Sequence, residues 1–186
     1  MILSNKEIKR AIQENRIGID PSPKEPFKTT SVDLRLEKRI KIPKDNLEIV
    51  VDPRGKIANT LKELYKDETI QDSGYLLEPG KFILGQTFER INLPLHPDNE
   101  NNVIAARVEG KSSLARCGLL VHFTAPTIHA GFQGNITLEM INLGKYPILL
   151  RFQMPICQLI FETVLNTPDP HTGQFHGQSR PNGIVS

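Results

Sequence analysis

The chain is poor in the residues that mark several common protein classes. It contains two cysteines, Cys117 and Cys157, and no tryptophan. A disulfide framework in a small secreted protein usually needs more cysteines, so both are expected to be buried as small apolar side chains. No apolar run approaches membrane-spanning length, and the N-terminus lacks the long apolar stretch of a signal peptide. We therefore expect a cytoplasmic protein with reduced thiols and no membrane partner.

An excess of charge of either sign is also missing. The 23 lysines and arginines nearly balance 21 aspartates and glutamates, which leaves a formal net charge of +2. This charge is too small to predict a nucleic acid as partner, so any site for an anion must be local. The ligand pattern of one common catalytic zinc site, H-x-E followed by P-C-x-x-C, is missing too. The run Pro155-Ile156-Cys157 has no second cysteine close by, so no zinc is expected.

What the sequence does contain predicts a mainly β protein. Its 13 glycines and 14 prolines are spread along the chain, which is typical of short elements joined by turns. Residues 31–36 alternate between apolar and polar side chains, which is a strand pattern. Many short strands at such spacing predict a sandwich or barrel. Further strands are expected at 40–42, 47–51, 75–77, 82–88, 102–108, 119–124, 135–142, 148–152 and 157–164.

Two short helices are expected in the first third of the chain. The segment Ser4-Asn5-Lys6-Glu7 has the spacing of a capping box and predicts a helix that runs to about Asn15. A second helix is expected over 57–67. Because no linker or repeat divides the sequence, a single domain over 1–186 is expected. Its polar tail, 166–186, is rich in glycine and proline and is expected to act as a mobile lid.

The most informative segment is Glu109-Gly110-Lys111-Ser112-Ser113-Leu114-Ala115-Arg116. Its glycine lets the backbone approach an anion closely, and N–H groups with serine hydroxyls can surround phosphate oxygens. Lys111 or Arg116 would supply positive charge. The alternative is a short helical turn whose cations are solvated. A P-loop is excluded because G-x-x-x-x-G-K-[ST] is absent.

A second segment, 122–139, combines small residues with two glycines, which leave backbone groups free to contact a ligand. Phe132 can pack against a deoxyribose face, and its alternative is an ordinary core position. Glu139 lies on the strand face opposite its apolar neighbours. A carboxylate in a largely apolar strand can have a raised pKa and carry protons, and the alternative is a glutamate that faces solvent.

The chain resembles the dCTP deaminase family of the dUTPase superfamily. The resemblance rests on Ile2-Leu3-Ser4, Ser31-Val32-Asp33-Leu34-Arg35-Leu36, residues 110–119, residues 122–139, and Cys157-Gln158-Leu159-Ile160-Phe161. It implies a dUTPase-like β-barrel or jelly roll with a few short helices. It also implies a homotrimer with active sites at the subunit interfaces, and zinc-independent hydrolysis of dCTP to dUTP and ammonia.

The resemblance implies roles for individual residues as well. Glu139 would be the general base and proton carrier, while Ser112 and the Ala125 carbonyl hold the water that attacks C4 of cytosine. Arg116 would orient Glu139 or Ser112 and stabilise developing charge. Mg²⁺ would bind through the triphosphate. The residues implied to contact the nucleotide are Lys111, Ser113, Thr127, His129, Phe132, Gln158 and Gln178.

The sequence departs from the family pattern at three places. His129 stands where the family usually carries Asp beside the sugar, and Pro126-Thr127 replaces the common pair before it. In the tail, Gln174 and Phe175 stand for Lys and Tyr. These departures keep two alternatives open. One is a bifunctional enzyme that releases dUMP and pyrophosphate, and the other is a catalytically weak nucleotide-binding regulatory homologue.

Overall fold

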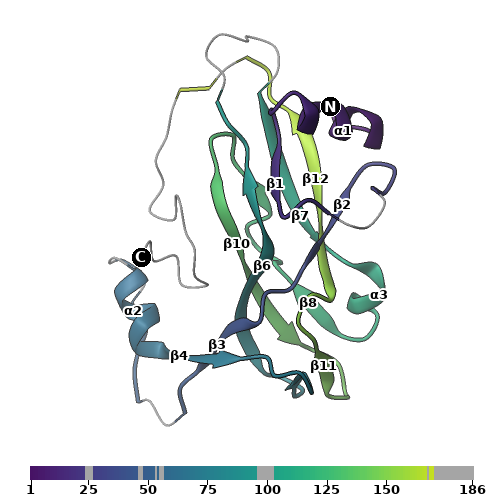
Figure 1. Cartoon of the computed structure of the whole chain (residues 1–186). Helices are drawn as coiled ribbons and strands as arrows, with labels where there is room; N and C mark the ends of the chain where they lie inside the picture. The colour runs from purple at the N-terminus through teal and green to yellow at the C-terminus, as the bar shows by residue number, and fades with distance from the viewer. Residues whose placement is uncertain are drawn as a thin grey trace.

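The computed structural model describes residues 1–23, 27–45, 48–52, 54, 57–95, 103–166 and 168–169. The described chain is an elongated assembly of antiparallel strands (Figure 1). The helices are α1 (Asn5–Gln13), α2 (Ile57–Leu64) and α3 (Ser112–Ala115). The strands are β1 (Gly18–Asp20), β2 (Val32–Arg35), β3 (Arg39–Pro43), β4 (Tyr65–Thr69), β5 (Tyr75–Leu77), β6 (Phe82–Asn92), β7 (Ile104–Gly110), β8 (Leu119–Val121), β9 (Thr127–Ile128), β10 (Gln133–Asn142), β11 (Ile148–Leu150) and β12 (Pro155–Thr163).

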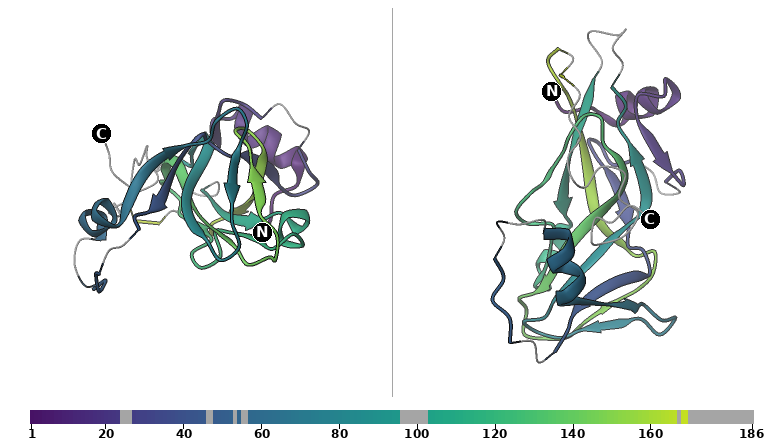
Figure 2. Two further views of the ribbon diagram at one scale, coloured as in Figure 1. Left: turned by 90° about the horizontal axis from the view of Figure 1, so that it is seen from below. Right: turned by 90° about the vertical axis from the view of Figure 1, so that its left-hand side faces the viewer.

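The described strands form a large sheet, a second sheet packed against it, and a small two-stranded ribbon. The large sheet has the order β4-β3-β6-β10-β8, with β1 added on β6. The second sheet has the order β2-β12-β7-β9, and β11 pairs with β5 in the ribbon. Figure 2 shows the barrel along and across its long axis, with α2 standing outside the wall beside β4. The mainly β fold expected from the sequence is thereby confirmed.

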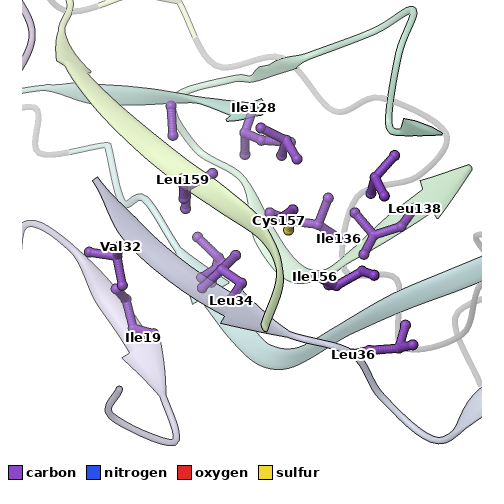
Figure 3. Packing of buried hydrophobic residues seen from close by; sticks show 14 of the residues in the cluster. Ile19, Val32, Leu34, Leu36, Ile128, Ile136, Leu138, Ile156, Cys157 and Leu159 are labelled. Carbon is purple, nitrogen blue, oxygen red and sulfur yellow. The ribbon is translucent and has the colours of Figure 1, made fainter. Parts of the chain in front are cut away.

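The hydrophobic core lies between the sheets because their strands alternate. From Gly134 to Asn142, strand β10 alternates buried and half-buried residues, so Ile136, Leu138 and Met140 face inward. Strands β2 and β12 contribute their own alternate residues to the same interior, as Figure 3 shows. The labelled members of this cluster are Ile19, Val32, Leu34, Leu36, Ile128, Ile136, Leu138, Ile156, Cys157 and Leu159.

One buried ion pair joins the two sheets. Glu89 of β6 is fully buried, and its Oε1 lies 2.6 Å from Nε of Arg35 on β2. The backbone N–H of Arg35 donates to the other carboxylate oxygen at 2.8 Å. The Arg35 guanidinium also stacks over the Phe88 ring, 4.9 Å from its centre. A buried carboxylate needs this degree of pairing, because desolvating a lone charge is very costly.

Several boundaries differ from those expected. The strand predicted over 47–51 is wrong for residues 48–51, which lie in irregular backbone. The helix predicted over 57–67 ends at Leu64, because the chain then pairs with β3 as strand β4. The pairing is reinforced where Lys41 Nζ lies 2.8 Å from a carboxylate oxygen of Asp67. Tertiary pairing therefore overrides the local helical tendency at this point.

The first helix also ends earlier than expected. Ser4 caps it, since its hydroxyl accepts from the Glu7 backbone N–H at 3.4 Å, as the capping box predicts. The helix ends at Gln13, and Asn15 takes a left-handed backbone conformation with φ of 57°. Asn tolerates that conformation better than most residues, so it suits a helix end. No helix of the described ranges is long and apolar enough to span a membrane.

Candidate active site

Glu139 is placed by the alternation of β10. Its neighbours Leu138 and Met140 are fully buried, whereas the Glu139 side chain is 33% exposed on the other face. Backbone pairing with Leu84 of β6 fixes its position in the sheet. The carboxylate therefore sits on a rigid strand with part of its surface open to solvent, as a proton carrier requires.

His122 lies directly opposite Glu139. The pairing of β8 with β10 places Val121 opposite Met140, so the next pair along the strands is His122 with Glu139. The His122 backbone N–H donates to the Glu139 carbonyl at 2.8 Å. Side chains of directly opposed residues lie close together, and His122 Nδ1 is 2.9 Å from Glu139 Oε2. At this distance the two side chains form an ion pair when the ring is protonated.

The second ring nitrogen of His122 is also engaged. Nε2 lies 2.8 Å from the Ala125 carbonyl oxygen. Because a carbonyl oxygen only accepts, Nε2 must carry a hydrogen and donate it. His122 itself is buried, at 9% exposed, and its φ of 51° is left-handed. A single buried ring thus connects Glu139, the expected base, with the Ala125 carbonyl, which is one of the two groups expected to hold the attacking water.

Each member of this pair shifts the pKa of the other in the direction opposite to the effect of burial. Burial is the largest influence on His122 and lowers its pKa, but the nearby Glu139 and the Ala125 and Thr137 carbonyls outweigh it, so the pKa is raised. Burial raises the pKa of Glu139, but His122 outweighs this effect and the net pKa is lowered. The raised Glu139 pKa expected from its apolar strand is therefore wrong, because the alternation along the strand does not show that His122 lies opposite Glu139.

Tyr65 of β4 is a further neighbour of the carboxylate. Burial, followed by the charge of Glu139, raises the pKa of its phenol group. Strands β3 and β6 lie between β4 and β10 in the sheet, so Tyr65 senses Glu139 through its charge and not through pairing of their strands. Neither Tyr65 nor His122 was singled out from the sequence, since the residues around Glu139 do not show which other strands lie near it.

The predicted phosphate segment forms a short helical turn. Residues Ser112–Ala115 form α3 directly after β7, with Lys111 at its N-cap. Ser112, Ser113 and Arg116 are exposed. Within the described chain their side chains have no hydrogen bond or ion pair, so they are available to a ligand or to another subunit.

Lys111 differs from its neighbours because its charge is already paired. Its Nζ lies 2.6 Å from Oδ2 of Asp33 on β2, and both side chains are largely buried. Asp33 lies opposite Gln158 of β12, whose Oε1 accepts from the Ser31 hydroxyl at 3.2 Å. The predicted phosphate contacts Lys111 and Gln158 thus lie on one sheet, held by polar partners.

The predicted sugar contacts lie on the segment between β8 and β10. Thr127, in β9, and His129 are both exposed. Phe132 is half buried and packs against the core, while its N–H donates to the His129 carbonyl at 3.1 Å. The core interpretation of Phe132 therefore holds in part. Gln178 and the tail from 170 onward lie outside the described residues.

Arg116 is exposed at the end of α3, whereas Glu139 belongs to β10. Arg116 lines a pocket of about 610 Å³ together with Cys117, Lys145 and Tyr146. No hydrogen bond or ion pair within the described ranges joins Arg116 to Glu139, so the orienting contact of Glu139 in this chain comes from His122. Cys117 is exposed, so its expected burial is wrong, whereas Cys157 is buried as expected. The described residues contain no cluster of three His, Cys, Asp or Glu side chains that could hold a metal.

Comparisons with known proteins now identify the family. A family model described as dCTP deaminase-like matches residues 2–164. The chain belongs to the dCTP deaminase family. A dUMP-forming dCTP deaminase of Methanosphaera stadtmanae is 38% identical, with 97% of this chain and 91% of that protein covered. A dCTP deaminase of Rhodospirillum rubrum is 37% identical, with 97% and 94% covered.

A solved structure confirms the fold of this family. The crystal structure of 2′-deoxycytidine 5′-triphosphate deaminase from Agrobacterium tumefaciens matches with a TM-score of 0.63. The match covers 86% of this chain and 47% of that chain, at 20% sequence identity. This likeness is one of overall fold.

Proposed function

We propose that the chain is a zinc-independent enzyme that deaminates dCTP hydrolytically, with Glu139 as the base. The observation that carries this proposal is the carboxylate itself, which is partly exposed, ionised and held by the buried His122. Relatives 37–38% identical over most of their length are named dCTP deaminases.

In the proposed reaction, water adds to C4 of the cytosine ring. Glu139 accepts a proton from that water and delivers a proton to the amino group, which leaves as ammonia. The net change is dCTP and water to dUTP and ammonia. The Ala125 carbonyl has a second lone pair after it accepts from His122, and this lone pair can hold the attacking water.

The remaining groups are proposed to come from another copy of the chain. Ser112 and Arg116 are exposed and make no hydrogen bond or ion pair within the described chain, whereas Glu139 belongs to a separate group of residues. A homotrimer with its sites at the subunit interfaces would bring both groups to one nucleotide. Lys111, Ser113 and Gln158 would face the triphosphate, and Mg²⁺ would arrive bound to phosphate oxygens.

A second candidate is a bifunctional enzyme. In it, dUTP is hydrolysed further, by water, to dUMP and pyrophosphate. The dUMP-forming name of the Methanosphaera stadtmanae relative favours this product. His129 is the position that separates the candidates, since it is exposed beside β9 and offers an imidazole where the family usually has a carboxylate.

The test is product analysis with a matched pair of proteins. Wild type and Glu139→Gln are incubated with Mg²⁺ and dCTP, dCMP, CTP or dUTP, and nucleotides and ammonia are quantified. We expect ammonia from dCTP with wild type and a loss of about 10²-fold or more with the variant, which keeps the shape but not the base. Wild-type turnover by Glu139→Gln would refute the assignment. Whether dUTP or dUMP accumulates decides between the two candidates.

The absence of zinc from the mechanism is tested separately. Purified protein is treated with a strong zinc chelator, then assayed with excess Mg²⁺. We expect full activity with dCTP. Stoichiometric zinc in the active protein, or activity restored only by added zinc, would contradict this part of the proposal.

A further inference from the structure

His122 holds three points of the site at once. Its backbone N–H bonds to the Glu139 carbonyl, its Nδ1 faces Glu139 Oε2, and its Nε2 donates to the Ala125 carbonyl. We propose that His122 is the positioning residue of the deaminase site. Its protonated ring pairs with Oε2 of Glu139. Oε1 is therefore the carboxylate oxygen that is left to take the proton from water. This inference rests on the proposed role of Glu139 as base.

The proton count follows from the contacts. Nε2 carries a hydrogen because its partner is a carbonyl. A nitrogen lone pair and a carboxylate lone pair would repel each other at 2.9 Å, so Nδ1 and Oε2 must share at least one proton. The raised pKa of His122 and the lowered pKa of Glu139 place this proton on Nδ1, so His122 is doubly protonated beside an ionised Glu139.

The two oxygens of Glu139 are therefore not equivalent. Oε2 is buried against His122, whereas the side chain as a whole keeps 33% of its surface exposed. In the reaction His122 keeps both of its protons. The proton from water forms its new bond to Oε1 and then leaves Oε1 for the departing nitrogen, so charge and atoms balance without any change at the imidazolium.

The surroundings of His122 support this constant charge. The charged group that faces it is Glu139 from β10, and the carbonyls of Ala125 and Thr137 face it as acceptors. Tyr65 of β4 interacts with Glu139 and is neutral at neutral pH, because its pKa is raised. Every group that contacts the ring thus favours the protonated form, which burial alone would disfavour.

The pair defines a range of pH for the base. Glu139 has a lowered pKa, so the ion pair is lost when pH falls through that value and the carboxylate is protonated. His122 has a raised pKa, so the ion pair is lost when pH rises through it and the ring becomes neutral. We expect kcat to fall on both sides of this range.

Two substitutions separate position from charge. Asn is tolerated at a left-handed φ, and His122→Asn keeps a side-chain amide near Oε2 without positive charge. His122→Gln can reach the Ala125 carbonyl but not both partners. Gln153→Asn is the matched control, since Gln153 is exposed in a turn and has a similar φ of 58°. The control is expected to retain wild-type kcat and pH profile.

The readout is the pH profile of dCTP deamination. With His122→Asn, burial of Glu139 is no longer opposed by a cation, so the acid limb of kcat moves to higher pH and the alkaline limb disappears. With His122→Gln, we expect kcat to fall by about 10²-fold, because the carboxylate is no longer held in place. Unchanged limbs in His122→Asn, or wild-type kcat in His122→Gln, would overturn the proposal.

A measurement without turnover distinguishes this inference from the proposed function. The imidazole pKa of His122 is followed by NMR in wild type and in Glu139→Gln. We expect a raised pKa in wild type and a lowered one in the variant, since burial remains and the carboxylate charge is gone. An unchanged pKa would overturn the ion pair even in an active enzyme. The expected change in a protein that deaminates nothing would instead show that only the proposed function fails.

Discussion

Replacing Arg35 by Met should destabilise the fold strongly because it leaves the Glu89 carboxylate buried. Glu89 is fully buried and receives Nε of Arg35 at 2.6 Å, so the guanidinium supplies its neutralising charge. Breaking a buried pair by removing one partner costs about 3–5 kcal/mol. The Arg35 backbone N–H would still donate to Glu89, which favours the lower end of that range. Against a total stability of about 5–15 kcal/mol, the loss is large.

The double variant Arg35→Met with Glu89→Met makes the reasoning testable. It removes both charges and keeps similar side-chain volume, so stability should return to within about 1–2 kcal/mol of wild type or exceed it. The assay is urea unfolding at one fixed protein concentration, because subunit association would contribute to the measured free energy. A double-mutant cycle then gives the coupling energy. If Arg35→Met lost less than about 1 kcal/mol, or the two losses simply added, the buried carboxylate would not depend on its partner as argued.

Three further predictions concern other parts of the chain. Gly118→Ala should unfold at a clearly lower temperature or fail to fold. A Cβ there would collide with the Gly144 backbone, and Gly118 has a left-handed φ of 93° that favours glycine. A melting temperature equal to that of wild type would contradict this. Lys111→Met should raise KM for dCTP about tenfold or more, because the nucleotide loses a charged contact and Asp33 loses its cationic partner. An unchanged KM would show that Lys111 does not bind phosphate. His129→Asp should hydrolyse dUTP faster than wild type if the histidine limits that step, and robust pyrophosphate release by wild type would show that it does not.

The local sequence pattern was sufficient to predict most of the strands. A strand that is buried on one face alternates apolar and polar residues, and this period of two is visible in the sequence. The alternation around Glu139 predicted which way its side chain points, and the structure has that arrangement. The same rule failed over 48–51, where apolar residues lie in irregular, exposed backbone, as with Val50 at 96% exposed. It failed again at Tyr65, because pairing with β3 and not the preceding helical pattern decides the conformation. Short strands such as β9 carry too few residues for any period to show.

Prediction of the candidate site from the sequence meets a different limit. The site depends on the register between β8 and β10, which local patterns do not reveal. Glu139 was identified through a motif, but the state of its carboxylate depends on the residue opposite it. That residue is His122, separated from Glu139 by β9 and a loop, and nothing in the residues on either side of Glu139 indicates the pairing. A one-residue shift of β8 against β10 would turn the imidazole to the other face of the sheet and restore the raised pKa that burial alone predicts. The proton chemistry of this site is therefore determined by strand pairing as much as by the motif that contains its base.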